Sequence, residues 1–184
     1  MAATSSPAAL GWPAARFDLP GVDGRRHTLE GARGPNGLLV MFICNHCPYV
    51  RAVAAKIARV AEALARLGIG SIAIMSNDAS AYPEDSFDNM KTFAAEHGFG
   101  FPYVIDESQD VARAYDAVCT PDFFGFDRDL ALAYHGRLDA SGRKSDPDAA
   151  RELFEAMSAV ARGGRAPLSQ TPSIGCSIKW RAPS

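Results

Sequence analysis

Two cysteines three positions apart, Cys44 and Cys47, have the clearest chemical potential in this sequence. An apolar run at 38–43 favours a buried strand before them, and a long amphipathic pattern follows them. Side chains three apart in the first turn of a helix share one face, so the two sulfur atoms could form a disulfide. Unpaired N–H groups and the partial positive charge of a helix N-terminus favour thiolate over thiol. The pattern therefore predicts a thiol-disulfide active site.

The composition is that of a globular chain with an ordinary core. The 184 residues are 47% hydrophobic and 22% charged, with a formal net charge of -2. No basic stripe indicates a nucleic-acid partner, and no apolar run approaches the roughly 18–20 residues of a membrane span. The first ten residues lack the basic and apolar regions of a secretory signal, so we expect a cytoplasmic location. Thiols stay reduced there, so the cysteine spacing indicates redox or metal chemistry rather than structural disulfides.

Strand-like and helix-like patterns alternate along the chain. Apolar residues spaced by three and four predict a helix from about Cys47 to Leu67. Further strands are predicted at 69–75, 101–105, 122–126 and 130–134, and further helices at 87–97, 111–118 and 149–161. Residues 1–14 are interpreted as a flexible N-terminal arm and residues 165–184 as an irregular C-terminal tail. This order predicts an α/β fold, a mixed sheet with helices on both faces.

Several motifs resemble the thioredoxin-like superfamily, in its peroxiredoxin-like (AhpC/TSA-type) branch. The pair Cys44/Cys47 matches the superfamily's C-x-x-C motif, and Thr120-Pro121, ahead of a predicted strand, matches its cis-proline loop. Segments 103–107, 114–117 and 172–180 are also similar to this branch. The resemblance covers about residues 15–180 and implies a thioredoxin-like domain at 15–164, with extra N-terminal strands and an inserted helix. It also implies that Thr120 and Pro121 lie against the cysteines and hold the partner.

Two departures from these families bear on the chemistry. Thioredoxins carry a buried carboxylate six residues before the first cysteine, where this chain has Leu38, so the base for the second thiol is not identified. Peroxiredoxins carry Pro-x-x-x-Thr-x-x-Cys at the peroxide site. If Cys47 is aligned with that cysteine, Val40 replaces the proline and Cys44 replaces the threonine. The hydroxyl that orients a peroxide is therefore missing.

The favoured hypothesis is a cytoplasmic thiol-disulfide oxidoreductase. Cys44 is expected to be the more exposed and more acidic thiol, which attacks a protein or small-molecule disulfide, and Cys47 is expected to resolve the mixed disulfide. A charged His46 would stabilise the thiolates and place the reduction potential above that of thioredoxin. No cofactor or metal is predicted, no nucleic acid or membrane is an expected partner, and an external thiol would supply the electrons.

Several alternatives stay open. A peroxiredoxin-like thiol peroxidase would act on a peroxide through a sulfenic acid, and a redox-sensing binding module would use the disulfide only as a switch. Cys119 and Cys176 are candidate resolving thiols, although each could be inert. With Cys44 and Cys47 they also have the ligand count of a zinc site. His46 could be a plain turn residue, and Asn77 and Asp78 are interpreted as turn caps.

Overall fold

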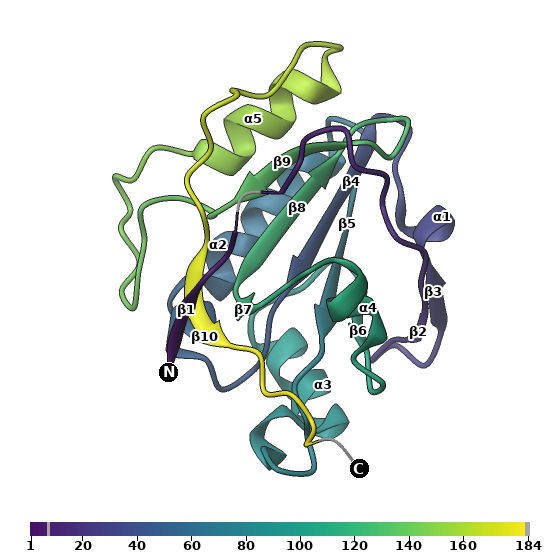
Figure 1. Ribbon diagram of the computed structural model, residues 1–184, viewed down its shortest axis with the longest axis vertical. Coiled ribbons are helices and arrows are strands. Elements are labelled where there is room, and N and C mark those ends of the chain that lie inside the picture. Colours follow the sequence, from purple (N-terminus) through teal and green to yellow (C-terminus); the bar gives the residue numbers. More distant parts are fainter. Residues whose placement is uncertain (7, 183–184) are drawn as a thin grey trace.

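A computed structural model describes residues 1–6 and 8–182 of the chain (Figure 1). Its central sheet has five strands in the order β6-β5-β4-β8-β9. They are β4 (Gly37–Phe42), β5 (Ile69–Met75), β6 (Tyr103–Ile105), β8 (Asp122–Phe126) and β9 (Leu132–Gly136). β4 pairs in parallel with β5 and antiparallel with β8, so the predicted strand at 38–43 lies at the centre of the sheet. The predicted mixed sheet is thereby confirmed.

Helices cover both faces of this sheet (Figure 1). One face packs against α2 (Pro48–Ala65), α3 (Phe87–Glu96) and α5 (Glu152–Ala161), and the other against α1 (Leu29–Ala32) and α4 (Asp110–Ala114). Alternate residues of β4 separate the two cores, because Leu39 and Met41 face α2 whereas Val40 and Phe42 face away from it. Burial on both faces explains why β4 is a continuous apolar run. The helix predicted from near Cys47 is confirmed as α2.

The two ends of the chain form a second, smaller sheet. β10 (Ile174–Ser177) pairs antiparallel with β1 (Ala2–Thr4) on one side and with β7 (Cys119–Thr120) on the other. Figure 1 shows β1 and β10 side by side. The predicted flexible arm and irregular tail are therefore wrong at these strands. Strands this short pair through their backbones and leave no side-chain periodicity in the sequence. Residue 7 of the arm and residues 183–184 of the tail lie outside the described residues.

The remaining elements differ little from the prediction. β2 (Asp18–Pro20) and β3 (Arg26–Thr28) form the extra N-terminal strands, as a hairpin. β9 begins at Leu132 rather than 130, because Leu130, with a φ of 58°, belongs to the turn after β8. A short 3-10 helix, η1 (Pro83–Asp85), lies in the polar loop between β5 and α3. None of the helices in the described part of the chain is long and apolar enough to cross a membrane.

Candidate active site

The C-x-x-C motif connects the end of β4 to the start of α2. Cys47 is the N-cap residue of α2, and Pro48 is its first helical residue. Proline suits that position because its fixed φ is already helical and it has no N–H to leave unpaired. The helix thus begins just after the second cysteine, and Cys44 lies in the preceding loop. The partial positive charge of the helix N-terminus therefore acts mainly on Cys47.

Both cysteines are buried against the Thr120–Pro121 loop. Cys44 Sγ lies 3.3 Å from Thr120 Oγ1, and the Cys47 thiol donates to the Thr120 carbonyl oxygen at 3.1 Å. The Thr120–Pro121 peptide is cis, which confirms the predicted cis-proline loop facing the motif. The expected exposure of Cys44 is wrong, because Cys44 and Cys47 are both 0% exposed. β10 contacts both α2 and β7 beside the motif.

Cys47, rather than Cys44, is the more acidic thiol. A hydrogen bond from the Cys44 thiol is the largest of the causes that lower the pKa of Cys47 from 9.0 to about 5. Burial opposes this shift, and so does the loss of the bond to the Thr120 carbonyl when the proton leaves. The Cys176 thiol and the N–H groups of Val50 and Cys176 add three more donors. Four donors to one sulfur outweigh the opposing effects, so the thiolate resides on Cys47.

Cys44 is correspondingly held in its protonated form. Its hydrogen bond to Cys47, its burial and the neighbouring Asp85 carboxylate, in that order, hold the pKa of Cys44 well above its usual range. The prediction that Cys44 is the more acidic thiol is therefore reversed. The expectation placed Cys44 in the first turn of the helix and included no carboxylate beside its sulfur, whereas α2 begins only after Cys47.

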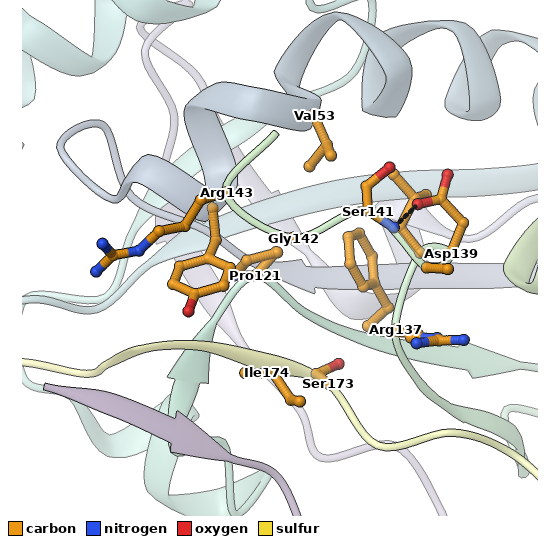
Figure 2. Close-up of a pocket in the computed structure, with 13 residues that line it drawn as sticks. Val53, Pro121, Arg137, Asp139, Ser141, Gly142, Arg143, Ser173 and Ile174 are labelled. Atoms are coloured by element: carbon orange, nitrogen blue, oxygen red, sulfur yellow. Dashed lines mark hydrogen bonds between the residues drawn. The ribbon is translucent and has the colours of Figure 1, made fainter. Parts of the chain in front are cut away.

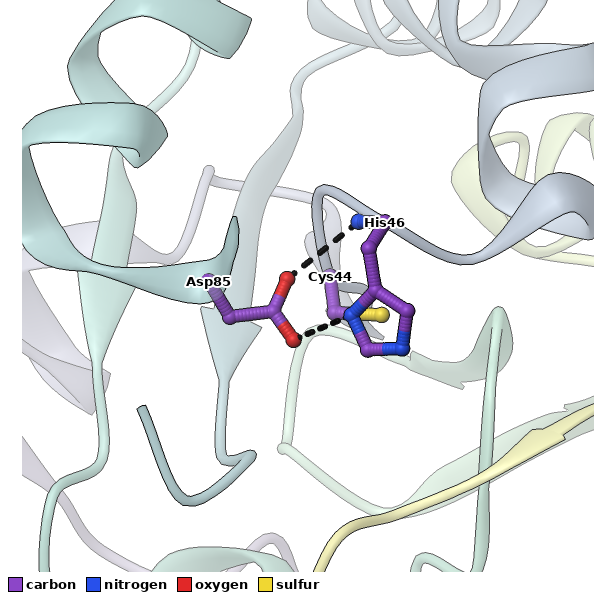
Figure 3. Close-up of side chains that lie close together, drawn as sticks. All are labelled: Cys44, His46 and Asp85. Carbon is purple, nitrogen blue, oxygen red and sulfur yellow. Dashed lines mark hydrogen bonds and ion pairs between the residues drawn. The ribbon is translucent and has the colours of Figure 1, made fainter. Parts of the chain in front are cut away.

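That carboxylate, Asp85, is the main residue that the sequence analysis missed. It ends η1, is 0% exposed, and faces the imidazole of His46 next to the Cys44 sulfur (Figure 3). Its Oδ1 accepts from the N–H groups of Asn45 (2.8 Å) and His46 (3.3 Å). Its Oδ2 accepts from Asn77 Nδ2 at 2.7 Å and lies 2.6 Å from His46 Nδ1. These four bonds match the roughly four acceptor sites of a carboxylate.

The structure also gives His46 and the loop after β5 definite partners. The His46 side chain is 25% exposed and stacks on Tyr82, with ring centroids 5.7 Å apart. It is thus more than a plain turn residue, although Asp85 balances the charge it would carry. Asp78 is the predicted turn cap, because it accepts from Ser80. Asn77 is not a turn cap, since its amide links Asp85 to the backbone of the C-terminal tail.

One group of side chains has the composition of a metal site. Candidate ligand atoms of Cys44, His46 and Asp85 lie within 4.8 Å of one another, and no other such group exists among residues 1–6 and 8–182. The zinc site that the four cysteines could have formed is therefore not assembled. The Asp85 oxygens already accept four hydrogen bonds, so this group fits proton exchange with Cys44 better than metal coordination.

The two remaining cysteines lie in the small sheet beside the motif. Cys176 of β10 lies opposite Thr120 of β7, and its side chain is partly exposed. Burial first, and then its hydrogen bond to Cys47, raise the pKa of Cys176 to about 11. Cys119 is 0% exposed, its nearest acceptor is the Pro121 carbonyl at 3.9 Å, and burial raises its pKa. Cys119 thus resembles a core residue, whereas Cys176 contacts the thiolate.

A cavity of about 320 Å³ opens beside Pro121 (Figure 2). Tyr49, Val53, Phe123 and Ile174 supply much of its apolar wall. Two of its charged side chains are paired, Arg137 with Glu152 and Asp139 with Lys56. The third, Arg143, lies over the ring of Tyr49 and has no ion pair with any residue that the structure describes. The cavity therefore combines apolar surface with one unpaired positive charge.

Fold and site together define a thioredoxin-like protein with a buried, asymmetric thiol pair. The chain belongs to the AhpC/TSA family, whose sequence profile matches residues 10–135. No curated protein matches the chain. An uncharacterized conserved protein from Geobacillus kaustophilus is 45% identical, with a TM-score of 0.95 over 100% of this chain and 98% of its own.

Two more distant structures, each 17% identical, share the fold. One is the thioredoxin domain of a thiol-disulfide oxidoreductase from Bacteroides vulgatus, with a TM-score of 0.59 over 70% of this chain and 89% of its own. The other is a peroxidoxin from Mycobacterium tuberculosis, with a TM-score of 0.60 over 85% and 97%. The thioredoxin-like fold and the resemblance to the peroxiredoxin-like branch are thus confirmed.

Proposed function

We propose that this protein is a thiol-disulfide oxidoreductase in which Cys47 is the attacking thiolate and Cys44 the resolving thiol. The position of Cys47 at the N-cap of α2, where the partial positive charge of the helix end favours a thiolate, carries this proposal together with the lowered pKa of Cys47. These two features describe a reduced pair in which one sulfur is charged and its neighbour keeps a proton. The order of attack is the reverse of the one that the sequence predicts.

The reaction proceeds in two exchanges. The Cys47 thiolate attacks one sulfur of a substrate disulfide and forms a mixed disulfide with it. The S–S bond of the substrate breaks, and the other substrate sulfur leaves as a thiol after taking a proton from solvent. Cys44 then gives its proton to the His46–Asp85 pair, which lies within 4.8 Å, and attacks the Cys47 sulfur. A Cys44–Cys47 disulfide forms and the second substrate thiol leaves. The substrate gains two electrons, which an external thiol later returns to the protein, in a cytoplasmic setting.

The cavity beside Pro121 supports a class of substrate. Its apolar wall and unpaired Arg143 suit a small disulfide that carries a carboxylate, such as an oxidised peptide thiol. Arg143→Gln should raise KM about 1.4- to fivefold and leave kcat unchanged, because an exposed ion pair contributes about 0.2–1 kcal/mol. Arg162→Gln is a control on the exposed end of α5. An unchanged KM in Arg143→Gln would remove the cavity from the proposal.

Trapping a mixed disulfide tests the order of attack. Wild type, Cys44→Ser and Cys47→Ser are each mixed with oxidised glutathione, and mass spectrometry locates the adduct. We expect Cys44→Ser to form first a glutathione adduct on Cys47, which Cys44 can no longer resolve, and Cys47→Ser to lose at least about 100-fold in rate, because it lacks the thiolate. An adduct on Cys44 would overturn the order. A wild type that becomes oxidised without turnover would favour the redox-sensing alternative instead.

A thiol peroxidase is the second candidate, favoured by the burial of the thiolate. Cys47 is 0% exposed at a helix N-cap, and a peroxide is small enough to enter where a protein is not. Its thiolate would attack the peroxide O–O bond and form a sulfenic acid, releasing an alcohol or water. Cys44 would then condense with the sulfenic acid and release water. Peroxide consumption by wild type, with a trapped sulfenic acid in Cys44→Ser, is the expected result for this alternative.

A further inference from the structure

Access to solvent differs among the cysteines gathered at the site. Cys44, Cys47 and Cys119 are each 0% exposed, whereas Cys176 is partly exposed. Thiol-disulfide exchange requires the attacking sulfur to reach the sulfur it attacks. A Cys44–Cys47 disulfide in this position is closed to a bulky reductant. Some other sulfur must therefore present the disulfide at the surface.

β10, the strand that carries Cys176, is fixed beside the site by pairing on both of its edges. Its backbone pairs with β1 on one edge and with β7 on the other, which sets Cys176 opposite Thr120. Gly175 approaches the Thr120–Pro121 peptide so closely that a Cβ atom there would lie 1.9 Å from the Thr120 carbonyl oxygen. Glycine at this position therefore allows β10 to reach the loop that also contacts Cys47. The side chain and the N–H of Cys176 both help to lower the pKa of Cys47, which places Cys176 beside that sulfur.

We propose that Cys176 is the thiol through which the external reductant reaches the site, by way of a Cys47–Cys176 disulfide. The three sulfur atoms then form a relay in which Cys47 exchanges partners between Cys44, which is buried, and Cys176, which is partly exposed. This inference rests on the proposed function, because it needs a disulfide at Cys47, and it assigns the step that restores the dithiol.

The relay conserves atoms and electrons in three exchanges. Cys176 loses its proton and attacks the Cys47 sulfur, the Cys44–Cys47 bond breaks, and Cys44 regains a proton. An external thiolate then attacks the Cys176 sulfur, and Cys47 leaves as the thiolate that its donors stabilise. A second external thiol attacks the adduct and releases Cys176 as a thiol. The protein gains two electrons, and two external thiols become one disulfide.

The second exchange of the relay is kinetically favoured, because Cys47 is its leaving group. A thiol with a lower pKa leaves faster from a disulfide, and the pKa of Cys47 is lowered to about 5. Attack on the Cys176 sulfur thus expels the best leaving group of the cluster. Once Cys47 is in a disulfide, its bond to Cys176 no longer holds the proton on Cys176, so one cause of the raised pKa of Cys176 is removed.

Single-turnover kinetics of Cys176→Ser test the relay. Oxidation of the Cys44/Cys47 pair by a small disulfide is the reference step, because Cys47 is intact and the serine hydroxyl can still donate to it, and re-reduction is compared with that step in each variant. Re-reduction by thioredoxin, used as a bulky dithiol probe, should slow at least about tenfold, since its thiol cannot reach a buried sulfur. Cys119→Ala, which removes a buried thiol of the same sheet, is the matched control and should match wild type in both steps. Re-reduction of Cys176→Ser at the wild-type rate would overturn the proposal.

Two further variants test the relay independently of Cys176→Ser. Oxidised Cys44→Ser should contain a Cys47–Cys176 disulfide by peptide mapping, and its absence would contradict the relay. Gly175→Ala should push β10 off the Thr120–Pro121 loop and slow re-reduction although Cys176 is present. A Gly175→Ala variant that is re-reduced at the wild-type rate would also count against it. If wild type forms no Cys44–Cys47 disulfide, the proposed function fails first, which separates the two outcomes.

Discussion

The sulfur of Cys47 faces hydrogen-bond donors, whereas the sulfur of Cys44, three residues earlier, faces a carboxylate. Four donors converge on Cys47 at the start of α2. Cys44 lies in the loop before the helix and close to Asp85, which disfavours a second negative charge. Equal burial of the two residues therefore produces opposite acid–base behaviour. The helix start and the nearby charges, rather than exposure or position in the motif, therefore decide which thiol is the more acidic.

Two histidine–aspartate pairs, each with a buried carboxylate, differ in the exposure of their histidine. His46 uses Nδ1 for Asp85 and is a quarter exposed, so it can exchange a proton with solvent. His135 lies 3.1 Å from Asp122 through Nε2, accepts the Ala8 N–H through Nδ1, and has a side chain that is 4% exposed. Both of its nitrogens are engaged and it is sealed from solvent. The proposed mechanism uses the first pair for proton transfer, whereas the second pair belongs to the core.

The largest expected effect is the pH profile of thiol alkylation. With a pKa of about 5 instead of 9.0, Cys47 should gain reactivity as the pH rises through 5 and be constant above pH 7. At pH 7 about 99% of Cys47 would be thiolate, against about 1% of an ordinary thiol with a pKa of 9.0. Stopped-flow alkylation with iodoacetamide over pH 4–10 measures this. Cys47→Ser should lose the acidic step, and an acidic step that survives would assign it to another thiol.

Removal of the Cys44 donor should have the next largest effect. A hydrogen bond to a charged group contributes about 1.5–3 kcal/mol, which corresponds to roughly one to two pH units. Cys44→Ala should therefore raise the pKa of Cys47 by about that amount. Cys44→Ser is the matched control, because its hydroxyl can still donate, and it should shift the pKa less. Equal pKa values of Cys47 in both variants would show that Cys44 does not stabilise the thiolate.

Asp85→Asn is expected to act on Cys44 rather than on Cys47. Without the negative charge the pKa of Cys44 should fall, so Cys44 should be alkylated faster at neutral pH. Resolution of the mixed disulfide should slow roughly tenfold, because the His46–Asp85 pair no longer accepts its proton. Asparagine also leaves buried donors unpaired, at about 1–3 kcal/mol of unfolding free energy.

Asp106→Asn is the control for that loss of stability. Asp106 is 0% exposed and accepts bonds from Ser76 and from the N–H groups of Val111 and Ala112, away from the cysteines. Thermal unfolding should show comparable losses in the two variants, with changed thiol reactivity in Asp85→Asn alone. If Asp106→Asn alters the alkylation of Cys44 equally, the effect is structural and Asp85 has no specific role.

Much of the fold and part of the site could be predicted from the sequence. The apolar run of β4, the periodicity of α2 and the Thr120-Pro121 dipeptide are local signals, and each gave the correct element. Asp85 could not be found in this way, because its role depends on a loop that folds back across about forty residues to Cys44. β10 was missed because it is defined by backbone pairing with β1 and β7, and no side-chain pattern in the sequence reports such pairing.

The smallest expected effect concerns His46 and the reduction potential. A protonated His46 favours the reduced pair, but Asp85 at 2.6 Å cancels most of its field at the sulfur atoms. His46→Gln should therefore lower the potential by only tens of millivolts, where about 30 mV corresponds to roughly 1.4 kcal/mol for this two-electron couple. Glutathione redox titration measures the change. His27→Gln is the control. His27 lies 3.1 Å from Asp23 on the surface, so its removal should leave the potential unchanged. An unchanged or raised potential of His46→Gln would mean that the imidazolium does not stabilise the reduced pair.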